Sequence, residues 1–198
     1  MRLSLVVVNW NTGELIRRCV ESIYADLSVC ADLPVGEAEV FIVDSASTDG
    51  STLAVQEQFP QAITIYSPKN IGFGPANNLA LRRATGGYIL LLNPDTLVHP
   101  GAIASLLSFM EQHPDAGAAA SRLLNPDGSL QHSCSPEPTL WGEFLRLFHL
   151  GGVRSDGYYA METWDLQKPR PVDVILGACM LVRKAVLDQV GLFDEQFF

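Results

Sequence analysis

Short apolar runs alternate with amphipathic segments along the first half of the chain. Residues 3–8 form a nearly continuous apolar run rich in valine, which is typical of a strand covered on both faces. Similar runs at residues 39–44, 62–67 and 88–92 predict three further strands. Because helical patterns separate these runs, the alternation predicts an α/β fold, with a parallel sheet and helices on both of its faces.

The helices are predicted from apolar spacing and from their end signals. Thr12 is a suitable N-cap for a first helix whose inward positions would be Leu15, Ile16, Cys19, Val20, Ile23 and Leu27. Residues 51–59 predict a short helix that Pro60 ends, and Pro75 suits the first turn of a helix over 75–84. Residues 101–112 predict a helix with Ile103, Leu106, Leu107 and Met110 inward.

The second half has a different pattern. Residues 116–121 predict a strand of small residues, and turn residues at 125–128 precede another short strand. Residues 135–171 are irregular and rich in proline, and residues 172–191 predict strand, glycine break, strand and helix. The apolar stretch 139–152 predicts a helix that either covers the core or lies against a membrane or partner. With no long linker and no repeat, the simplest expectation is a single domain over 1–198.

Charge and composition exclude several classes of protein. The formal net charge is -9 with no basic stripe, so a nucleic acid is not an expected partner. The four cysteines are scattered, which is not a disulfide framework. No apolar run approaches the roughly 18 residues that span a membrane, and the first residues do not resemble a signal peptide. These observations predict a cytoplasmic chain.

Polar clusters follow the predicted strands where ligands bind in such sheets, beyond the strands' carboxyl ends. "NWNT" contains Asn9 and Asn11, and "DSASTDGS" contains Asp44, whose carboxylate could accept hydrogen bonds from a ribose or a base. The alternative for Asp44 is a local turn, and for Asp49 a local cap or turn is the preferred interpretation.

The stretch "SPKNIGFGPANNLAL" combines flexible glycines with the start of a helix. Gly72 and the helix start could approach an anion, and Asn70 and Asn78 flank the loop or cap its backbone. It is not a dinucleotide fingerprint, since Asn77 replaces the third glycine.

"LNPD" delivers Asp95 just past the fourth strand. A carboxylate here could bind Mg²⁺ or Mn²⁺ together with substrate phosphates, whereas the alternative is that Asn-Pro-Asp is only a turn.

Taken in order, these segments resemble the family-2 glycosyltransferases, in particular their rhamnosyltransferase-like branch. The matching stretches are "VVVNWNT", "VDSASTDGS", "NIGFGPANN", "LLNPDT", "LLNPDGSLQHS" and "GACMLVRKAVLDQVGLFDEQFF". The resemblance implies a Rossmann-like GT-A fold, with a nucleotide-binding half at 1–112 and an incomplete, mixed acceptor-side half at 113–198. It implies transfer of a sugar from a nucleotide-diphosphate donor, dTDP-rhamnose or a UDP-sugar, with inversion, to a polysaccharide or lipid-linked glycan.

The resemblance also implies the site residues. Asp44 would hold the nucleoside, and Asp95 would bind Mn²⁺ or Mg²⁺ at the metal position of the family's D-x-D motif. The first carboxylate of that motif is replaced by Asn93, which removes one charge. The nucleotide-binding residues implied are Asn9, Asn11, Asp44, Asn70, Gly72, Asn78 and Asn93.

The family's catalytic base lies in an acidic pair after a motif that matches 191–198, so the base is expected beyond Phe198. The chain is therefore expected to be a truncated transferase that binds donor and metal. The competing interpretation is a non-catalytic sugar-nucleotide-binding module. Exposure of Phe193, Phe197 and Phe198 would favour a homo-oligomer. A lipid-linked acceptor would place the enzyme peripherally at the inner face of a membrane.

Overall fold

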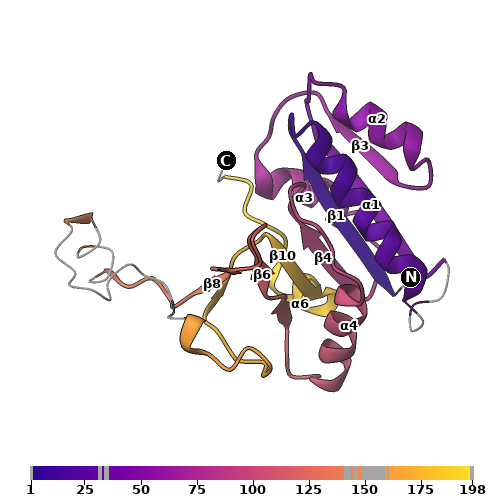
Figure 1. Cartoon of the computed structure of the whole chain (residues 1–198). Helices are drawn as coiled ribbons and strands as arrows, with labels where there is room; N and C mark the ends of the chain where they lie inside the picture. Colours follow the sequence, from indigo (N-terminus) through magenta and orange to yellow (C-terminus); the bar gives the residue numbers. More distant parts are fainter. Residues whose placement is uncertain are drawn as a thin grey trace. The chain divides into compact units, whose positions relative to one another are not determined.

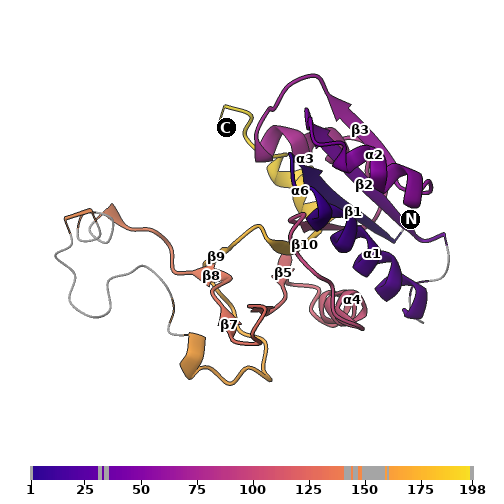
Figure 2. The ribbon, with the colours of Figure 1, turned by 45° about the horizontal axis from the view of Figure 1, so that its top comes forward.

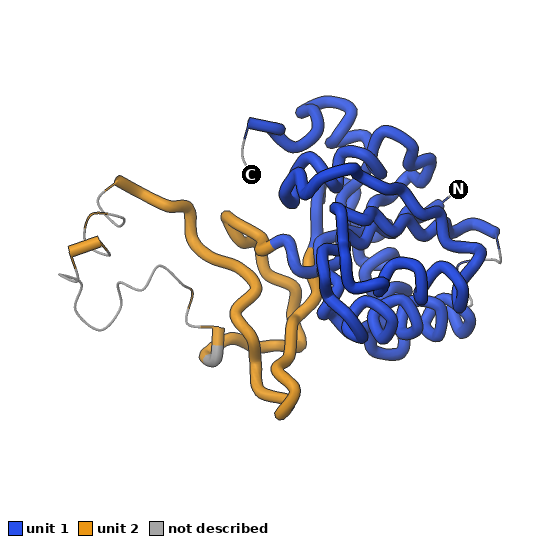
Figure 3. Tube along the Cα trace, turned by 90° about the horizontal axis from the view of Figure 1, so that it is seen from above, with its two compact units in different colours: residues 1–119, 177–198 blue, residues 120–176 orange. Residues whose placement is uncertain are grey.

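The computed structural model describes residues 2–30, 33, 36–140, 144, 147–148, 159 and 161–196. The chain divides into two compact units, which Figure 3 shows in different colours. Unit 1 contains residues 1–119 and 177–198, and unit 2 contains residues 120–176. The sheet and the candidate site lie in unit 1.

A six-stranded sheet in the order β3-β2-β1-β4-β10-β5 forms the centre of unit 1 (Figure 1). The neighbours β3, β2, β1 and β4 are parallel, whereas β10 is antiparallel to β4. The mostly parallel α/β sheet predicted from the sequence is therefore confirmed. The strands are β1 Leu3–Asn9, β2 Ala38–Ser45, β3 Ile63–Ser67, β4 Tyr88–Leu92, β5 Ala118–Ala120 and β10 Cys179–Arg183.

Helices cover both faces of this sheet (Figures 1 and 2). One face carries α1 Glu14–Val29, α2 Ser51–Gln58 and α4 Ala102–Gln112, and the other carries α3 Phe73–Leu81 and α6 Lys184–Val190. The change of face between α2 and α3 follows from right-handed crossovers, because the chain reverses its direction across the sheet after β3. As expected, α4 buries Ile103, Leu106, Leu107 and Met110.

The face beneath α3 holds a continuous apolar cluster. Val6, Val43 and Leu91 contribute from three adjacent strands, and Ala76 and Ala80 contribute from α3. Small residues on α3 let the helix approach the sheet closely. Burial of this cluster fixes α3, and therefore the loop that precedes it.

Two helix starts differ from the sequence expectations. Gly13, not Thr12, is the N-cap of α1, and the Thr12 hydroxyl donates to Asn9 Oδ1 instead. Leu15 is 47% exposed, so it does not face the core as its spacing suggested. The third helix begins at Phe73 rather than at Pro75, with Gly72 at φ 81° as its N-cap.

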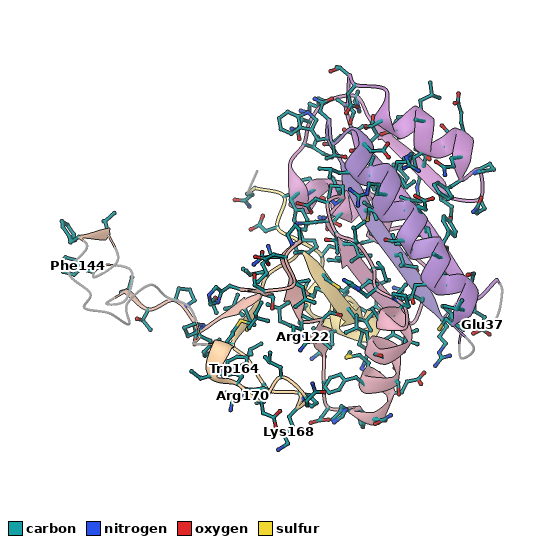
Figure 4. All side chains as sticks on the ribbon, in the orientation of Figure 1. Glu37, Arg122, Phe144, Trp164, Lys168 and Arg170 are labelled. Atoms are coloured by element: carbon teal, nitrogen blue, oxygen red, sulfur yellow. The ribbon has the colours of Figure 1, made fainter. Side chains whose placement is uncertain are left out.

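The described part of unit 2 contains two small antiparallel sheets of two strands each. β6 Leu123–Leu124 pairs with β7 Leu130–Gln131, β8 Cys134–Ser135 pairs with β9 Val174–Ile175, and a 3-10 turn spans Met161–Thr163. The Arg170 guanidinium lies 4.7 Å from the Trp164 ring centroid, and Figure 4 labels both residues. Most of the predicted helix at 139–152 lies outside the described residues. Among the residues that the structure does describe, no helix is long and apolar enough to cross a membrane.

Candidate functional site

The carboxyl ends of the parallel strands bring the predicted polar residues to one edge of the sheet. Asn9 at the end of β1 lies opposite Asp44 of β2 in register, and Leu92 at the end of β4 lies opposite Val7. Because β10 is antiparallel, its first residue, Cys179, lies beside Leu92 at this same edge. The loops after β1, β2 and β4, and the loop before β10, therefore meet there.

Asn9 joins the first two loops from within the core. Its side chain is fully buried, and Nδ2 donates to Ser51 Oγ at 2.8 Å and to Thr52 Oγ1 at 2.7 Å. Oδ1 accepts from the Thr12 hydroxyl. Both amide atoms are thus used within the protein, so Asn9 holds the edge together.

Asp44 has the next position on that edge and is 5% exposed. Its Oδ1 accepts from Thr52 Oγ1 at 2.8 Å and from the Ser47 backbone N–H at 3.3 Å. These hydrogen bonds hold the carboxyl group in a single orientation at the end of β2. A carboxylate fixed in this way is suited to accepting hydrogen bonds from a polar ligand.

Asn11 connects the loop after β1 to the loop after β2. It has a positive φ of 52°, which asparagine tolerates better than most residues, and its Oδ1 accepts from the Thr48 backbone N–H at 2.7 Å. Asp49 adds a second link, since its Oδ2 accepts from the Gly13 N–H at 2.9 Å. Hydrogen bonds from Ser51 and from backbone N–H groups hold the pKa of Asp49 below its usual value, in agreement with the local capping role expected for it.

Asn70 and Gly72 form a compact turn beside β2. Asn70 Oδ1 accepts from Ser45 Oγ at 3.2 Å and from the Gly72 N–H at 3.0 Å. Ser45 Oγ in turn accepts from the Ile71 N–H. The side chain of Asn70 thus fixes the loop that leads into α3.

Asn78 contacts the C-terminal part of the chain. It is 1% exposed, its Nδ2 donates to Phe193 O at 2.8 Å, and its Oδ1 accepts from the Phe193 N–H at 3.1 Å. Phe193 is half-buried against the core cluster and not exposed as the sequence suggested. Phe197 and Phe198, the other members of the expected apolar patch, lie outside the described residues.

The segment after β4 exposes one carboxylate and anchors the residues around it. Asn93 N donates to Ala178 O at 3.0 Å, and Asn93 O accepts a weak bond from the Cys19 thiol at 3.6 Å. Asp95 is exposed, and its carboxylate forms no hydrogen bond or ion pair with the residues that the structure describes. The pKa of Cys19 is raised to about 12, mainly because the thiol is buried and secondly because the Asp95 carboxylate is nearby.

The protein side chains at this edge could hold a hard divalent cation only together with oxygen atoms from a bound substrate. Among residues 2–196 with their gaps, no group of three or more His, Cys, Asp or Glu side chains is placed to hold a metal. Mg²⁺ and Mn²⁺ at phosphate sites commonly use one or two protein carboxylates plus phosphate oxygens. Asp95 meets that requirement because its carboxylate is exposed.

Trp10 is a feature of this edge that the sequence interpretation did not single out. Its side chain is 56% exposed although it directly follows the buried strand β1. The signal was present, since an aromatic residue stands between two asparagines in a loop at the carboxyl end of a strand. Ser51 and Thr52 were also missed as partners of Asn9 and Asp44.

The strand order and the mostly parallel pairing are those of a Rossmann-like sheet of the GT-A class, with the polar loops and the exposed Asp95 at its carboxyl edge. Among solved structures, S. aureus TarS 1-349 is similar over 99% of this chain and 51% of its own, with 22% identity and a TM-score of 0.65. The mannosyltransferase PcManGT of Pyrobaculum calidifontis, determined with GDP-Man and Mn²⁺, is similar over 98% of this chain and 48% of its own, with 24% identity and a TM-score of 0.62. These similarities support the fold.

The family follows from the sequence comparison. Residues 4–191 match the family model "Glycosyl transferase family 2", and the chain therefore belongs to this family. The N-acetylglucosaminyl-diphospho-decaprenol L-rhamnosyltransferase of Mycobacterium tuberculosis is 28% identical over 99% of this chain and 66% of its own length. The low-salt glycan biosynthesis hexosyltransferase Agl10 of Haloferax volcanii is 27% identical over 99% of this chain and 57% of its own. The chain thus spans about two thirds or less of these relatives.

Proposed function

We propose that this chain carries the donor-binding part of an inverting glycosyltransferase. The donor is a sugar linked to a nucleoside diphosphate, and the acceptor is a hydroxyl of a polysaccharide or lipid-linked glycan. The observation that carries the proposal is the exposed Asp95 carboxylate, at the same sheet edge as Asp44, in a chain that matches glycosyl transferase family 2 over residues 4–191. The mycobacterial relative is named as an L-rhamnosyltransferase, so dTDP-rhamnose is the first donor to test and UDP-sugars are the second.

The nucleoside would bind across the ends of β1 and β2. Asp44 is held by Thr52 and Ser47, so its remaining acceptor capacity is available to a ribose or a base N–H. Trp10, the residue after Asn9, offers an exposed aromatic side chain at this edge. Asn9, Asn70 and Asn78 use their amides within the protein, which favours a role in shaping the pocket walls over direct contact with the nucleotide.

The diphosphate would lie toward Asp95. In a chain of formal charge -9, a divalent cation on Asp95 is the expected means of binding a polyanion. When bound, Mn²⁺ or Mg²⁺ would stabilise the negative charge that develops on the leaving nucleoside diphosphate. Asn93 leaves the cation with one protein carboxylate fewer than a D-x-D motif supplies, so much of its binding would depend on the donor phosphates.

Inversion also requires a base that deprotonates the acceptor hydroxyl. Glu195 is poorly suited to this role, because hydrogen bonds from Asn78 and Arg82 hold its pKa below the usual value. Asp194 Oδ1 accepts from the Gln196 backbone N–H at 2.9 Å, as in a local turn. We therefore propose neither Glu195 nor Asp194 as the base. A lipid-linked acceptor would bring the enzyme to the inner face of a membrane.

Calorimetric titration of the 198-residue chain with dTDP and with UDP, each with Mn²⁺ and with EDTA, tests the donor site. We expect Mn²⁺-dependent binding of one nucleotide, weakened about tenfold or more by Asp95→Ala, since even the loss of a group that only supports a metal ligand typically costs 10- to 100-fold. Asp115→Ala is the matched control, because Asp115 is an exposed aspartate beside the amino end of β5. If nucleotide binding changes neither with Mn²⁺ nor with Asp95→Ala, the assignment of Asp95 to the metal site is refuted.

Product formation from dTDP-rhamnose separates a transferase from a binding module. Release of dTDP only when an acceptor glycan is present supports transfer by the chain. Donor binding without any dTDP release would leave this chain as a donor-binding part whose turnover needs further residues.

A further inference from the structure

Asn78 holds the segment after α6 against α3. Its two amide atoms bond the backbone N–H and C=O of a single residue, Phe193, at 3.1 and 2.8 Å. The same Nδ2 donates to Glu195 Oε1 at 2.9 Å, and Arg82 forms an ion pair with that carboxylate. Because a buried amide paired in both directions tolerates little displacement, Phe193 has a defined position on α3.

The ring of Phe193 continues this contact to a second aromatic residue. Phe73 and Phe193 meet edge to face, with centroids 5.9 Å apart and an interplanar angle of 70°. Gly74 makes room for Phe193, since a Cβ on Gly74 would lie 3.2 Å from Phe193 Cβ. The aromatic pair therefore rests directly on the first turn of α3.

Phe73 also packs on the loop that precedes β10. A Cβ added to Gly177 would lie 3.3 Å from Phe73 Cζ, so the ring sits almost on the backbone at this glycine. The next residue is Ala178, whose carbonyl oxygen accepts from Asn93 N at 3.0 Å and from Thr96 Oγ1 at 3.3 Å. These two donors stand on either side of Asp95 in the chain. A continuous series of contacts thus runs from Asn78 to the loop with the free carboxylate.

We propose that the Phe73–Phe193 pair positions Asp95, which makes Phe73 and Asn78 positioning residues for the metal carboxylate. The inference rests on the proposed metal role of Asp95. Mg²⁺ in particular tolerates little distortion of its octahedral ligand geometry, so a displaced Ala178 carbonyl would disturb the cation through Asn93 and Thr96. Energetic coupling through packed side chains of this kind amounts to about 0.5 to 2 kcal/mol, or roughly 2- to 30-fold in affinity.

The test compares nucleotide binding by Phe73→Leu in Mn²⁺ and in EDTA. Ligand-observed NMR with the nucleoside diphosphate that binds the unmodified chain covers weak as well as tight affinities. We expect Phe73→Leu to weaken binding about 2- to 30-fold in Mn²⁺ and to leave binding in EDTA unchanged. We also expect it to have no effect in an Asp95→Ala background, because no carboxylate then remains to be positioned.

Two matched controls separate positioning from general loosening. Phe59→Leu disrupts a stacked aromatic pair elsewhere in unit 1, in which the ring centroids of Tyr24 and Phe59 lie 5.3 Å apart, and should not change the Mn²⁺ dependence. If Phe73→Leu fails to fold, Gly177→Ala replaces it, because its Cβ meets the Phe73 ring. Gly87→Ala is the control for that variant, since its Cβ would find only an ordinary contact at 3.8 Å.

The outcomes separate this inference from the proposed function. Equal weakening in Mn²⁺ and EDTA would mean that Phe73 touches the nucleotide directly, and no weakening would mean that the pair is only structural. Either result overturns the inference while Asp95→Ala still abolishes the metal effect. If Asp95→Ala itself leaves Mn²⁺-dependent binding intact, the proposed metal role and the inference both fail.

Discussion

Thr52 Oγ1 donates a hydrogen bond of 2.8 Å to Asp44 Oδ1, and the same oxygen accepts from Asn9 Nδ2 at 2.7 Å. This hydroxyl therefore joins the ends of β1 and β2 through one buried atom. Thr52→Val keeps the shape and leaves both partners one hydrogen bond short. We expect unfolding free energy to fall by about 1–3 kcal/mol, and nucleotide affinity to fall as Asp44 loses its orientation.

Thermal unfolding and titration calorimetry on the same samples measure both effects. A loss of about 1–3 kcal/mol corresponds to roughly 2–12 °C in melting temperature for a chain of this size. Thr48→Val is a suitable control, because Thr48 is exposed and bonds Asn11 mainly through its backbone N–H. An unchanged melting temperature for Thr52→Val would contradict the structural role.

The strands and helices were largely predictable because burial imposes a period on the sequence. The apolar runs at β1 and β4 and the inward spacing of α4 directly reflect the two covered faces of the sheet. Helix starts were less predictable, because whether a side chain caps a helix depends on the conformation of the preceding loop. Thr12 has the right chemistry to cap α1, but its hydroxyl donates to Asn9.

The candidate site shows a similar division. Asn9, Asp44 and Asp95 were expected at one edge, because the carboxyl ends of parallel strands must meet there. The partner of Asn78 was not predictable, since Phe193 is 115 residues away in sequence. No local pattern identifies such a contact. The sequence feature nearest to this contact is the combination of glycine and asparagine residues in the stretch that begins α3.

Glu195 makes the C-terminal segment sensitive to acid. Hydrogen bonds from Asn78 and Arg82 lower its pKa from the ordinary 4.5. A lowered pKa means that the stabilising contribution is complete above pH 4.5 and is lost as the pH falls through the folded-state pKa. We expect the Phe193 backbone amide and the Asn78 side-chain amide to shift together in NMR spectra below that pH. Glu195→Gln should remove this transition, and its persistence in that variant would assign it to another group.

Cys19 is expected to resist alkylation in the folded chain. Its thiol is fully buried, and burial together with the Asp95 carboxylate raises its pKa to about 12, so very little reactive thiolate is present near pH 8. Cys30 is half-buried and provides an internal comparison. Mass spectrometry after brief iodoacetamide treatment should find Cys30 modified first, and Cys19 only after urea is added. Equal alkylation rates for Cys19 and Cys30 in the folded chain would show that the loop after β4, which contacts Cys19 through Asn93, opens readily.

Arg183 connects β10 to the end of α4. Its guanidinium donates to Met110 O at 2.9 Å, to His113 O at 3.3 Å and to Tyr88 Oη at 3.1 Å. The carbonyls at a helix C-terminus lack partners within the helix and carry partial negative charge, so a cation there is favourable. The flat guanidinium can reach several acceptors at once, which a single ammonium group cannot do.

Arg183→Lys is therefore expected to lower the free energy of unfolding by about 2 kcal/mol although it keeps the charge. Denaturant unfolding followed by circular dichroism measures this difference. Lys184→Met is the matched control, because Lys184 forms an ion pair with Asp188 at the surface, and exposed pairs of this kind contribute about 1 kcal/mol or less. If Arg183→Lys is as stable as the original chain, the charge at the end of α4 matters and the geometry of the guanidinium does not. If Lys184→Met costs as much as Arg183→Lys, general loosening of the start of α6 would explain both results.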